Sequence, residues 1–156
     1  MLEMKPKAKS LNEKFGFLDE DLRTDEHDDI IALCIDKQDD LFKQSGVEWA
    51  KSEMIEDVAL EYWIRQRGYN GNIFPIGAVD IMFTFKFPSG TVGDTRSLGV
   101  EVKTHIRSMG ELIRQVNLYS SYERYTKWVV VAPYQKNVSI LATAGIKYIN
   151  AELLKC

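Results

Sequence analysis

In the first half of the chain, apolar residues recur every three to four positions, which is the period of a helix with one buried face. The stretch IIALCIDKQDDLF predicts a helix, and Thr24 or Asp25 can cap it by accepting a hydrogen bond from its first turn. Gly46 interrupts the pattern. A second stretch, residues 48–67, keeps mostly the same spacing and ends at Gly68, which favours a second helix closed by glycine.

Beyond Gly68 the pattern changes to alternation, with many β-branched and aromatic residues. Residues 73–75 and 78–87 predict strand structure, and LGVEVKTHI predicts the next strand. The turn-forming segment PSGTVGDTRS lies between them, so we expect two antiparallel strands joined by a flexible loop. Asp80 and Glu101 fall on these two neighbouring strands.

The last third of the chain alternates between helix and strand signals. Ser108 and Glu111 form a capping-box pattern, which predicts a helix that begins there and runs to about Tyr125. KWVVVAP is a short, continuous apolar run of the kind found in buried strands, and a helix-like NVSILATAG and a short strand IKYI follow it. The whole order predicts an α/β fold with a central mixed sheet flanked by helices.

The length of 156 residues corresponds to a single domain. Residues 1–45 are predicted to form a partly helical N-terminal extension, of which residues 1–14 are polar, rich in lysine and loosely held. Residues 46–156 are predicted to form the core of the domain.

Composition excludes several classes of protein. A hydrophobic fraction of 45% is that of a globular chain, and no apolar run reaches the length of a membrane span, so we expect a soluble, cytoplasmic protein. Its two cysteines, Cys34 and Cys156, form no disulfide framework. Together with His27 and His105 they would have to converge from unrelated segments to bind zinc, so structural zinc is not expected.

The net charge of -3 conceals an uneven distribution. Residues 1–61 hold 17 acidic and 8 basic side chains, whereas residues 62–156 hold 6 acidic and 12 basic ones. Local rather than total charge governs the binding of polyanions, so the basic part permits a nucleic-acid partner. Unevenly charged helix surfaces account for the same numbers equally well.

Glu101 and Lys103 are two residues apart on a predicted strand and therefore lie on one face of it. A metal-dependent phosphodiesterase needs a carboxylate to hold the ion and a nearby cation to position water or stabilise the transition state. This spacing supplies both groups. Taken alone, the pattern also fits the solvated polar face of an ordinary strand.

Asp80 strengthens the case, because it lies within an apolar run on the preceding strand. Two carboxylates that converge from adjacent strands repel each other unless a cation lies between them, and a hard divalent ion suits oxygen ligands. The alternative is an ion pair of Asp80 with Lys103 or Lys86.

These residues resemble the conserved pattern of the PD-(D/E)XK nuclease superfamily over roughly residues 52–149. Asp80 matches the first acidic position of that pattern, although Val79 precedes it where the family often has proline. Glu101 and Lys103 match the (D/E)-x-K. The helix that follows carries Gln115 and Tyr119, which resemble the Q-x-x-x-Y of RecB-like exonucleases and lie on one helix face.

The resemblance implies a restriction-endonuclease-like fold and a Mg²⁺ or Mn²⁺ site. Its metal ligands would be Asp80, Glu101, the Val102 carbonyl and a helix carboxylate, for which Glu56 is the match and Glu53 competes. The resemblance further implies catalytic roles for the first two of these and for two more residues. Lys103 would position and help to deprotonate the attacking water, and Gln115 would orient Lys103 or a phosphate.

Several basic and aromatic residues are candidates for contact with nucleic acid. Arginines would bind the phosphate backbone and tyrosines would pack against sugars or bases, namely Arg96, Arg107, Arg114, Tyr119 and Tyr122. Plain surface charge is the alternative for the arginines, and a place in the core is the alternative for Tyr119.

The leading hypothesis is a metal-dependent deoxyribonuclease acting in DNA repair, recombination or the processing of viral or mobile-element DNA. The alternative is an inactive nucleic-acid-binding or assembly module of the same fold. Small catalytic cores often use a partner surface, so a homodimer is a further expectation. Serine-type catalysis with His105 lacks any supporting motif, and phosphate-loop, dinucleotide and zinc-protease motifs are absent from the sequence.

Overall fold

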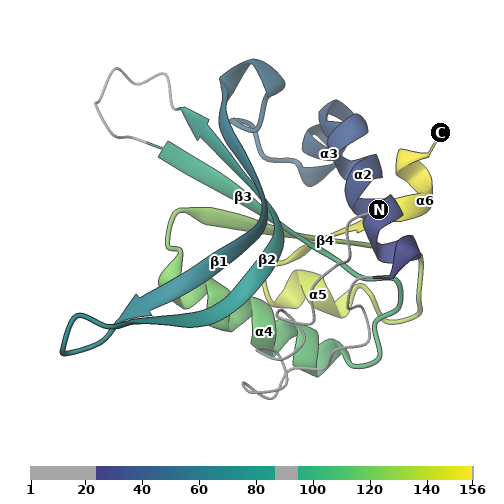
Figure 1. Ribbon diagram of the computed structural model, residues 1–156. Coiled ribbons are helices and arrows are strands. Elements are labelled where there is room, and N and C mark those ends of the chain that lie inside the picture. The colour runs from purple at the N-terminus through teal and green to yellow at the C-terminus, as the bar shows by residue number, and fades with distance from the viewer. Residues whose placement is uncertain (1–23, 87–94, 156) are drawn as a thin grey trace.

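A computed structural model describes residues 24–86 and 95–155 (Figure 1). The predictions for residues 1–14 and for most of the segment PSGTVGDTRS lie outside these residues. At the centre is a five-stranded sheet in chain order, β1-β2-β3-β4-β5. The first three strands are antiparallel, and β4 and β5 continue in parallel with β3, so the predicted α/β class and mixed sheet are confirmed. The strands are β1 (Ile55–Arg67), β2 (Ile73–Lys86), β3 (Thr95–Val102), β4 (Thr126–Ala132) and β5 (Lys147–Asn150).

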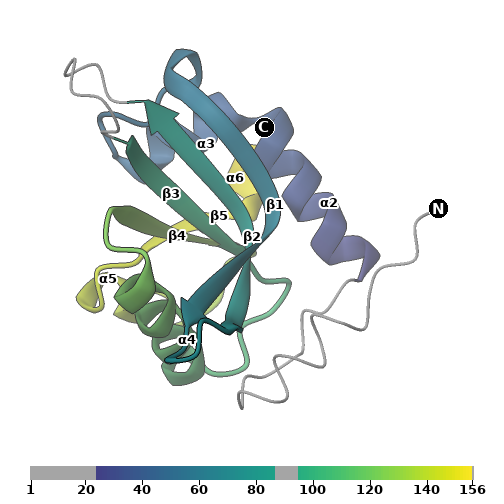
Figure 2. The ribbon, with the colours of Figure 1, turned by 60° about the vertical axis from the view of Figure 1, so that its left-hand side comes forward.

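Helices cover both faces of the sheet (Figures 1 and 2). Their bounds are α2 (Asp25–Asp36), α3 (Gln38–Ser45), α4 (Met109–Tyr122), α5 (Ile140–Thr143) and α6 (Ala151–Leu154). Both predicted N-terminal caps are present, since Thr24 accepts from the His27 backbone N–H and Ser108 accepts from that of Glu111. No helix within the described ranges is long and apolar enough to cross a membrane.

The helix predicted over residues 48–67 is wrong. A short 3-10 turn, η1 (Ser52–Met54), leads instead into β1, the edge strand of the sheet. Its pairing with β2 shifts register at two places, and Glu61 has a left-handed backbone with φ of 52°. These irregularities break the two-residue period, and the apolar positions that remain imitate helical spacing. Gly68 starts the turn to β2 rather than ending a helix.

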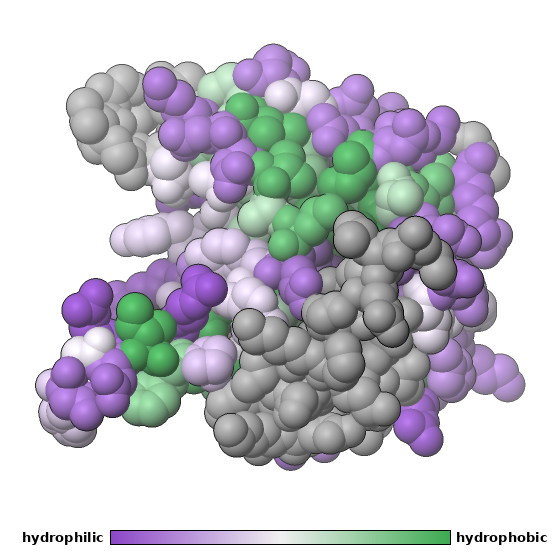
Figure 3. All heavy atoms as spheres, viewed as in Figure 1, coloured by the Kyte–Doolittle hydropathy of each residue, from purple (hydrophilic) through white to green (hydrophobic). Residues whose placement is uncertain are grey.

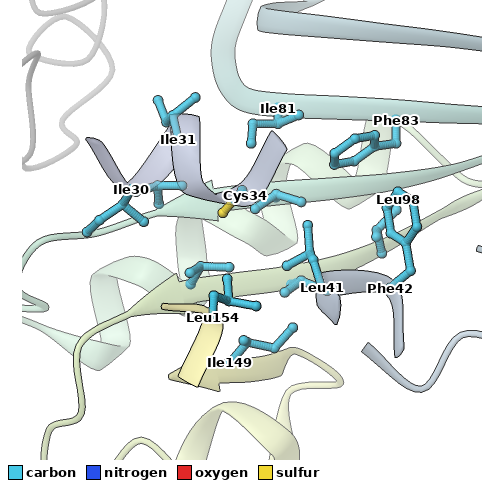
Figure 4. Close-up of a cluster of buried hydrophobic side chains, with 14 of the residues drawn as sticks. Ile30, Ile31, Cys34, Leu41, Phe42, Ile81, Phe83, Leu98, Ile149 and Leu154 are labelled. Atoms are coloured by element: carbon cyan, nitrogen blue, oxygen red, sulfur yellow. The ribbon is translucent and has the colours of Figure 1, made fainter. Parts of the chain in front are cut away.

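On one face of the sheet, helices α2, α3 and α6 pack onto β2, β3, β4 and β5 in a core that is almost entirely apolar (Figure 4). Phe42 from α3 packs edge-on against Phe83 and Phe85, with ring centroids 4.9 and 5.2 Å apart. Cys34 from α2 is fully buried there, and burial together with the charge of Asp80 raises the pKa of its thiol to about 12. Residues 25–45 therefore share their core with the sheet.

The opposite face is covered by α4 and α5. Two glycines let large rings lie directly on the strands. A Cβ atom at Gly77 would come 2.7 Å from the Tyr119 ring, and one at Gly99 would come 2.4 Å from the Trp128 ring. Because such distances are shorter than van der Waals contact, each glycine is required by the ring above it.

The hairpin of β1 and β2 extends beyond the rest of the sheet. Pairing of β2 with β3 ends at Ile81, opposite Val100, whereas β1 and β2 stay paired as far as Arg67 and Ile73. The outer part of this hairpin, residues 62–79, is called the arm below; its turn is at the lower left of Figure 1 and it is seen from another side in Figure 2.

Candidate active site

Asp80 lies at the point where β2 leaves β3. The first residue pair of the two strands is Ile81 with Val100, so the backbone around Asp80 has no ladder partner on the β3 side. Its carboxylate fills this gap, since Oδ2 accepts the Val102 backbone N–H at 2.8 Å. The side chain remains 21% exposed. The end of the strand pairing therefore fixes both the position and the orientation of this carboxylate.

Glu101 and Lys103 point to the face covered by α4, because they alternate with Val100 and Val102, whose side chains are buried on the other face. Lys103 Nζ lies 3.7 Å from Glu101 Oε2. Glu101 Oε1 is buried and has no hydrogen-bond partner among the described residues. The structure thus brings Glu101, Lys103 and, from β2, Asp80 together, as the sequence predicts.

The pKa values of the two carboxyl groups shift in opposite directions. Burial, followed by the neighbouring charge of Asp80, raises the pKa of Glu101 well above its usual range, and Lys103 only partly opposes this. Burial also acts to raise the pKa of Asp80. The contact with His27, the Val102 N–H and the charge of Lys103 outweigh burial and lower that pKa below its usual range. As the pH rises, Asp80 is therefore the first of the two carboxyl groups to lose its proton.

His27 is the partner of Asp80 that sequence reasoning missed. Its Nε2 lies 3.4 Å from Asp80 Oδ1, and the residue is only 3% exposed. Neither Lys103 nor Lys86 forms a direct ion pair with Asp80 among the described contacts, although Lys103 is close enough to lower its pKa. One signal could have indicated this placement. His27 is one and two helical turns before residues 30–31 and 34, so it shares their buried face of α2.

The predicted Gln115 and Tyr119 pair forms a buried linkage between α4 and β2. Gln115 Nε2 donates to the Tyr119 hydroxyl at 2.9 Å, and that hydroxyl donates to the Ala78 carbonyl at 3.3 Å. Tyr119 is fully buried, so the expectation that it contacts nucleic acid is wrong and the alternative, a place in the core, is correct. The linkage holds β2 two residues from Asp80.

The structure does not bring Glu56 or Glu53 to the site. Glu53 lies in η1 and Glu56 on β1, both exposed, so neither is a carboxylate on a helix. The residue of β1 opposite Asp80 is Glu61, because Leu60 pairs with Ile81 and Tyr62 with Val79. Five strand residues separate Glu56 from Glu61, which is about 17 Å. The predicted role of Glu56 as a metal ligand is therefore wrong.

The remaining candidates for contact with nucleic acid are spread over several elements. Arg96 lies near the start of β3 with its guanidinium 5.7 Å from the centre of the Tyr125 ring. Arg107 is exposed in the loop that follows Lys103, and Arg114 is exposed on α4 where it pairs with Glu111. The exposed Tyr122 donates from its hydroxyl to Gln66 Oε1 at 3.0 Å, on the arm. These side chains form no single patch around Asp80, and their roles stay predictions.

Two further findings bear on the site. In residues 24–86 and 95–155, no group of three or more His, Cys, Asp or Glu side chains is arranged to hold a metal ion. Comparison with protein-family models, with curated proteins and with solved structures finds no match to this chain. The function of the protein is therefore inferred from the chemistry of the site.

Proposed function

We propose that the protein is a Mg²⁺- or Mn²⁺-dependent nuclease of the PD-(D/E)XK type that hydrolyses DNA phosphodiester bonds. One observation carries the proposal. The Glu101 carboxyl group is buried beside a second carboxylate, with one oxygen lacking a hydrogen-bond partner, while the Lys103 ammonium lies 3.7 Å from the other oxygen. Such a cluster is costly in a protein that gains nothing from it, and strongly perturbed carboxyl groups concentrate at functional sites.

The donor set fits a hard divalent ion. Asp80, Glu101 and the Val102 carbonyl would supply oxygen ligands, which are the ligands that Mg²⁺ and Mn²⁺ prefer. The unpartnered Glu101 Oε1 is the atom that a cation would satisfy. A bound ion would offset the repulsion between the carboxylates and withdraw charge from a phosphodiester. Side chains now engaged by His27 and Lys103 would have to turn toward it.

The residues around the donors have separate tasks in this proposal. Lys103 is held by Glu101, so its ammonium can orient a water molecule and donate a hydrogen bond to charge that develops on the phosphate. Gln115 acts through Tyr119, which ties α4 to the Ala78 carbonyl and so keeps Asp80 in place. The order of helix, antiparallel strands, helix and parallel strand also supports a restriction-endonuclease-like core.

The test is metal-dependent cleavage. Labelled single-stranded, duplex and branched DNA would be incubated with the protein and Mg²⁺, Mn²⁺ or EDTA, using the wild type, Asp80→Asn and the matched variant Asp57→Asn. Asp57 is an exposed carboxylate on β1, far from the site. Cleavage by the wild type and Asp57→Asn, but not by Asp80→Asn or in EDTA, is the expected result. Absence of metal-dependent cleavage by the wild type on all three DNA forms would refute the nuclease.

One observation favours the alternative, a module that binds nucleic acid or a partner without turnover. The side chains of Glu101 and Lys103 are only 5% and 11% exposed, so little of either group is open to a phosphate. A protein of this class would bind the same DNA equally well in EDTA and in Mg²⁺ and release no product. Measuring binding beside cleavage in the same samples separates the two functions.

A further inference from the structure

The two faces of the arm have different neighbours. Tyr62 donates from its hydroxyl to Glu123 Oε1, Ile64 lies in the core under α4, and Gln66 accepts from Tyr122. These alternate residues of β1 therefore face α4. Because side chains alternate along a strand, the other residues of this stretch face away from α4. These residues, Trp63, Arg65 and Arg67, define the outer face of the arm.

The outer face begins next to the candidate active site. Trp63 pairs with Ala78 across the hairpin, and Ala78 is two residues from Asp80 along β2, so the outer face begins close to that carboxylate. Further out, Arg65 pairs with a proline and Arg67 pairs with Ile73. A row of side chains on the outer face thus leads from the strand positions beside Asp80 to the tip of the hairpin.

This row has the chemistry of a surface for nucleic acid. Both arginines are exposed, and neither forms an ion pair within the described part of the chain. Residues 62–79 contain no aspartate or glutamate, so nothing on the arm itself neutralises them. Tyr69 at the turn is completely exposed and Ile73 is 56% exposed. Guanidinium groups beside exposed rings and apolar side chains match the phosphates and base faces of a polynucleotide.

The arm is also fixed in position by its contacts with α4. Tyr62 and Gln66 are hydrogen-bonded to the end of α4, and Tyr119 packs on Gly77 and bonds to Ala78. Figure 3 shows the arm at the lower left, standing away from the rest of the surface, with hydrophobic side chains flanked by hydrophilic ones. A ligand bound along the outer face would therefore be held at a fixed distance from Asp80.

That distance can be stated in nucleotides. Arg65 is opposite a residue five positions from Asp80 along β2, and Arg67 is opposite one seven positions away. At ~3.3 Å per strand residue these positions lie about 17 and 23 Å from Asp80. Stacked nucleotides rise ~3.4 Å each, so the two arginines are level with about the fifth and seventh nucleotide from a phosphate at the site.

We propose that the outer face of the arm, carrying Trp63, Arg65 and Arg67 with Tyr69 at its tip, is a binding track for a DNA strand whose phosphate lies at the Asp80 site. This deepens the nuclease function proposed above and rests on it for the phosphate at Asp80. The track gives the protein affinity for the strand beyond the cut, and Arg65 and Arg67 supply the phosphate contacts.

Binding to fluorescein-labelled single-stranded oligonucleotides of 4, 8, 12 and 20 nucleotides, measured by anisotropy in EDTA, tests the track without requiring cleavage. The double variant Arg65→Ala/Arg67→Ala is expected to bind the 12- and 20-nucleotide strands about tenfold more weakly at low salt. Its plot of log K against log salt should lose a slope of about 1.4, because each single-strand phosphate contact contributes ~0.7. The 4-nucleotide strand, too short to reach Arg65 from Asp80, should bind both proteins alike.

Matched controls separate the track from general charge. Lys43→Ala/Lys51→Ala removes two exposed cations from α3 and the segment after it, and it should leave binding of the long strands unchanged. Arg65→Lys/Arg67→Lys should recover most of the salt slope, because lysine also binds phosphate as a point charge. Tyr69→Ala, at a fully exposed position where folding is not at risk, should weaken long-strand binding at least about fivefold if bases stack on it.

Each outcome decides between the proposals. If Arg65→Ala/Arg67→Ala binds long strands as the wild type does, or if the lysine pair Lys43/Lys51 matters equally, the track is refuted whether or not the wild type cleaves DNA. If the arm variant loses long-strand affinity but the wild type never cleaves with any metal, the track stands and the nuclease fails. Binding of no oligonucleotide by the wild type refutes the track and turns the arm into a candidate protein interface.

Discussion

The two halves of β2 differ in what surrounds them. From Ile81 to Phe85 the strand lies between β1 and β3 and is covered on both faces, so Ile81, Phe83 and Phe85 are buried. From Ile73 to Val79 it has β1 on one edge and α4 on one face only, and its other face forms the outer face of the arm. Asp80 lies at the boundary.

This difference explains why a carboxylate with a shifted pKa lies at the boundary between the two halves of β2. In the inner half, a carboxylate would have to replace a buried apolar side chain. In the outer half, it would be solvated and would keep an ordinary pKa. At the boundary β2 no longer pairs with β3, so the Val102 N–H is left for the Asp80 carboxylate to accept. His27 lies 3.4 Å from that carboxylate, and the charge of Lys103 also acts on it. The end of strand pairing is what creates the site.

The largest expected effect tests the contrast between the halves by stability. Phe83→Ala should lower the free energy of unfolding by about 3–5 kcal/mol, because it empties a fully buried position packed against Phe42. Phe74→Ala, in the outer half and 50% exposed, should cost less than about 1 kcal/mol. Urea denaturation of both variants measures the contrast, and similar losses at the two positions would show that the arm belongs to the cooperative core.

The next effect concerns catalysis at the boundary. Lys103→Ala should lower turnover at least ~10²-fold, a loss of about 2.7 kcal/mol of transition-state stabilisation, while DNA affinity changes little. The matched variant is Lys86→Ala, which removes an exposed lysine at the end of β2. It should retain full turnover. Single-turnover kinetics and binding in EDTA give the two quantities separately. Cleavage that survives the loss of Lys103 would contradict its assignment to the water.

A smaller effect tests how the arm is fixed. Gly77→Ala should destabilise the protein by about 1–3 kcal/mol, since its Cβ would come 2.7 Å from the Tyr119 ring. It should also reduce cleavage, because the displaced Tyr119 no longer bonds to the Ala78 carbonyl beside Asp80. A Cβ atom at Gly110, at the start of α4, would lie 3.9 Å from the nearest neighbouring atom, which is ordinary van der Waals contact. Gly110→Ala therefore serves as the neutral control. Thermal unfolding and cleavage by the two variants measure this, and equal behaviour would place Tyr119 elsewhere.

The smallest effect concerns the raised pKa of Glu101. In EDTA, Glu101→Gln should raise the melting temperature at pH 8 by about 2 °C or more, because it removes a buried acid that loses its proton at high cost. The folded protein holds this proton more tightly than the unfolded chain, whose glutamates titrate near ~4.3. Stability contributed by the group is therefore complete below that pH and declines as the pH rises toward the folded pKa.

Two comparisons check this result. The gain from Glu101→Gln should disappear at pH 4, and Glu56→Gln at an exposed position should show no gain at either pH. Mn²⁺ should raise the melting temperature of the wild type more than that of Glu101→Gln, since binding to the folded state alone stabilises it. Equal Mn²⁺ shifts in both proteins would mean that the ion binds at another place.

Much of the fold follows from short-range patterns. The N-terminal caps of α2 and α4, the alternation of β2 and β3 and the apolar run of β4 were predicted because each signal needs only neighbouring residues. The meeting of Glu101 and Lys103 was predicted for the same reason, since the two-residue period places them on one face. Asp80 was found because an acid within an apolar run stands out.

The chain itself determined the class of the fold and three of the four polar groups at the site. Only the tertiary structure decided that residues 55–67 are an edge strand, that His27 of α2 meets Asp80, and that the hairpin outruns β3 to form the arm. Each of these depends on which segments, distant in sequence, lie side by side. The register shifts of β1 and the left-handed residue Glu61 obscure the two-residue period in its sequence. The pairing of β1 with β2 makes this segment a strand despite its helix-like pattern.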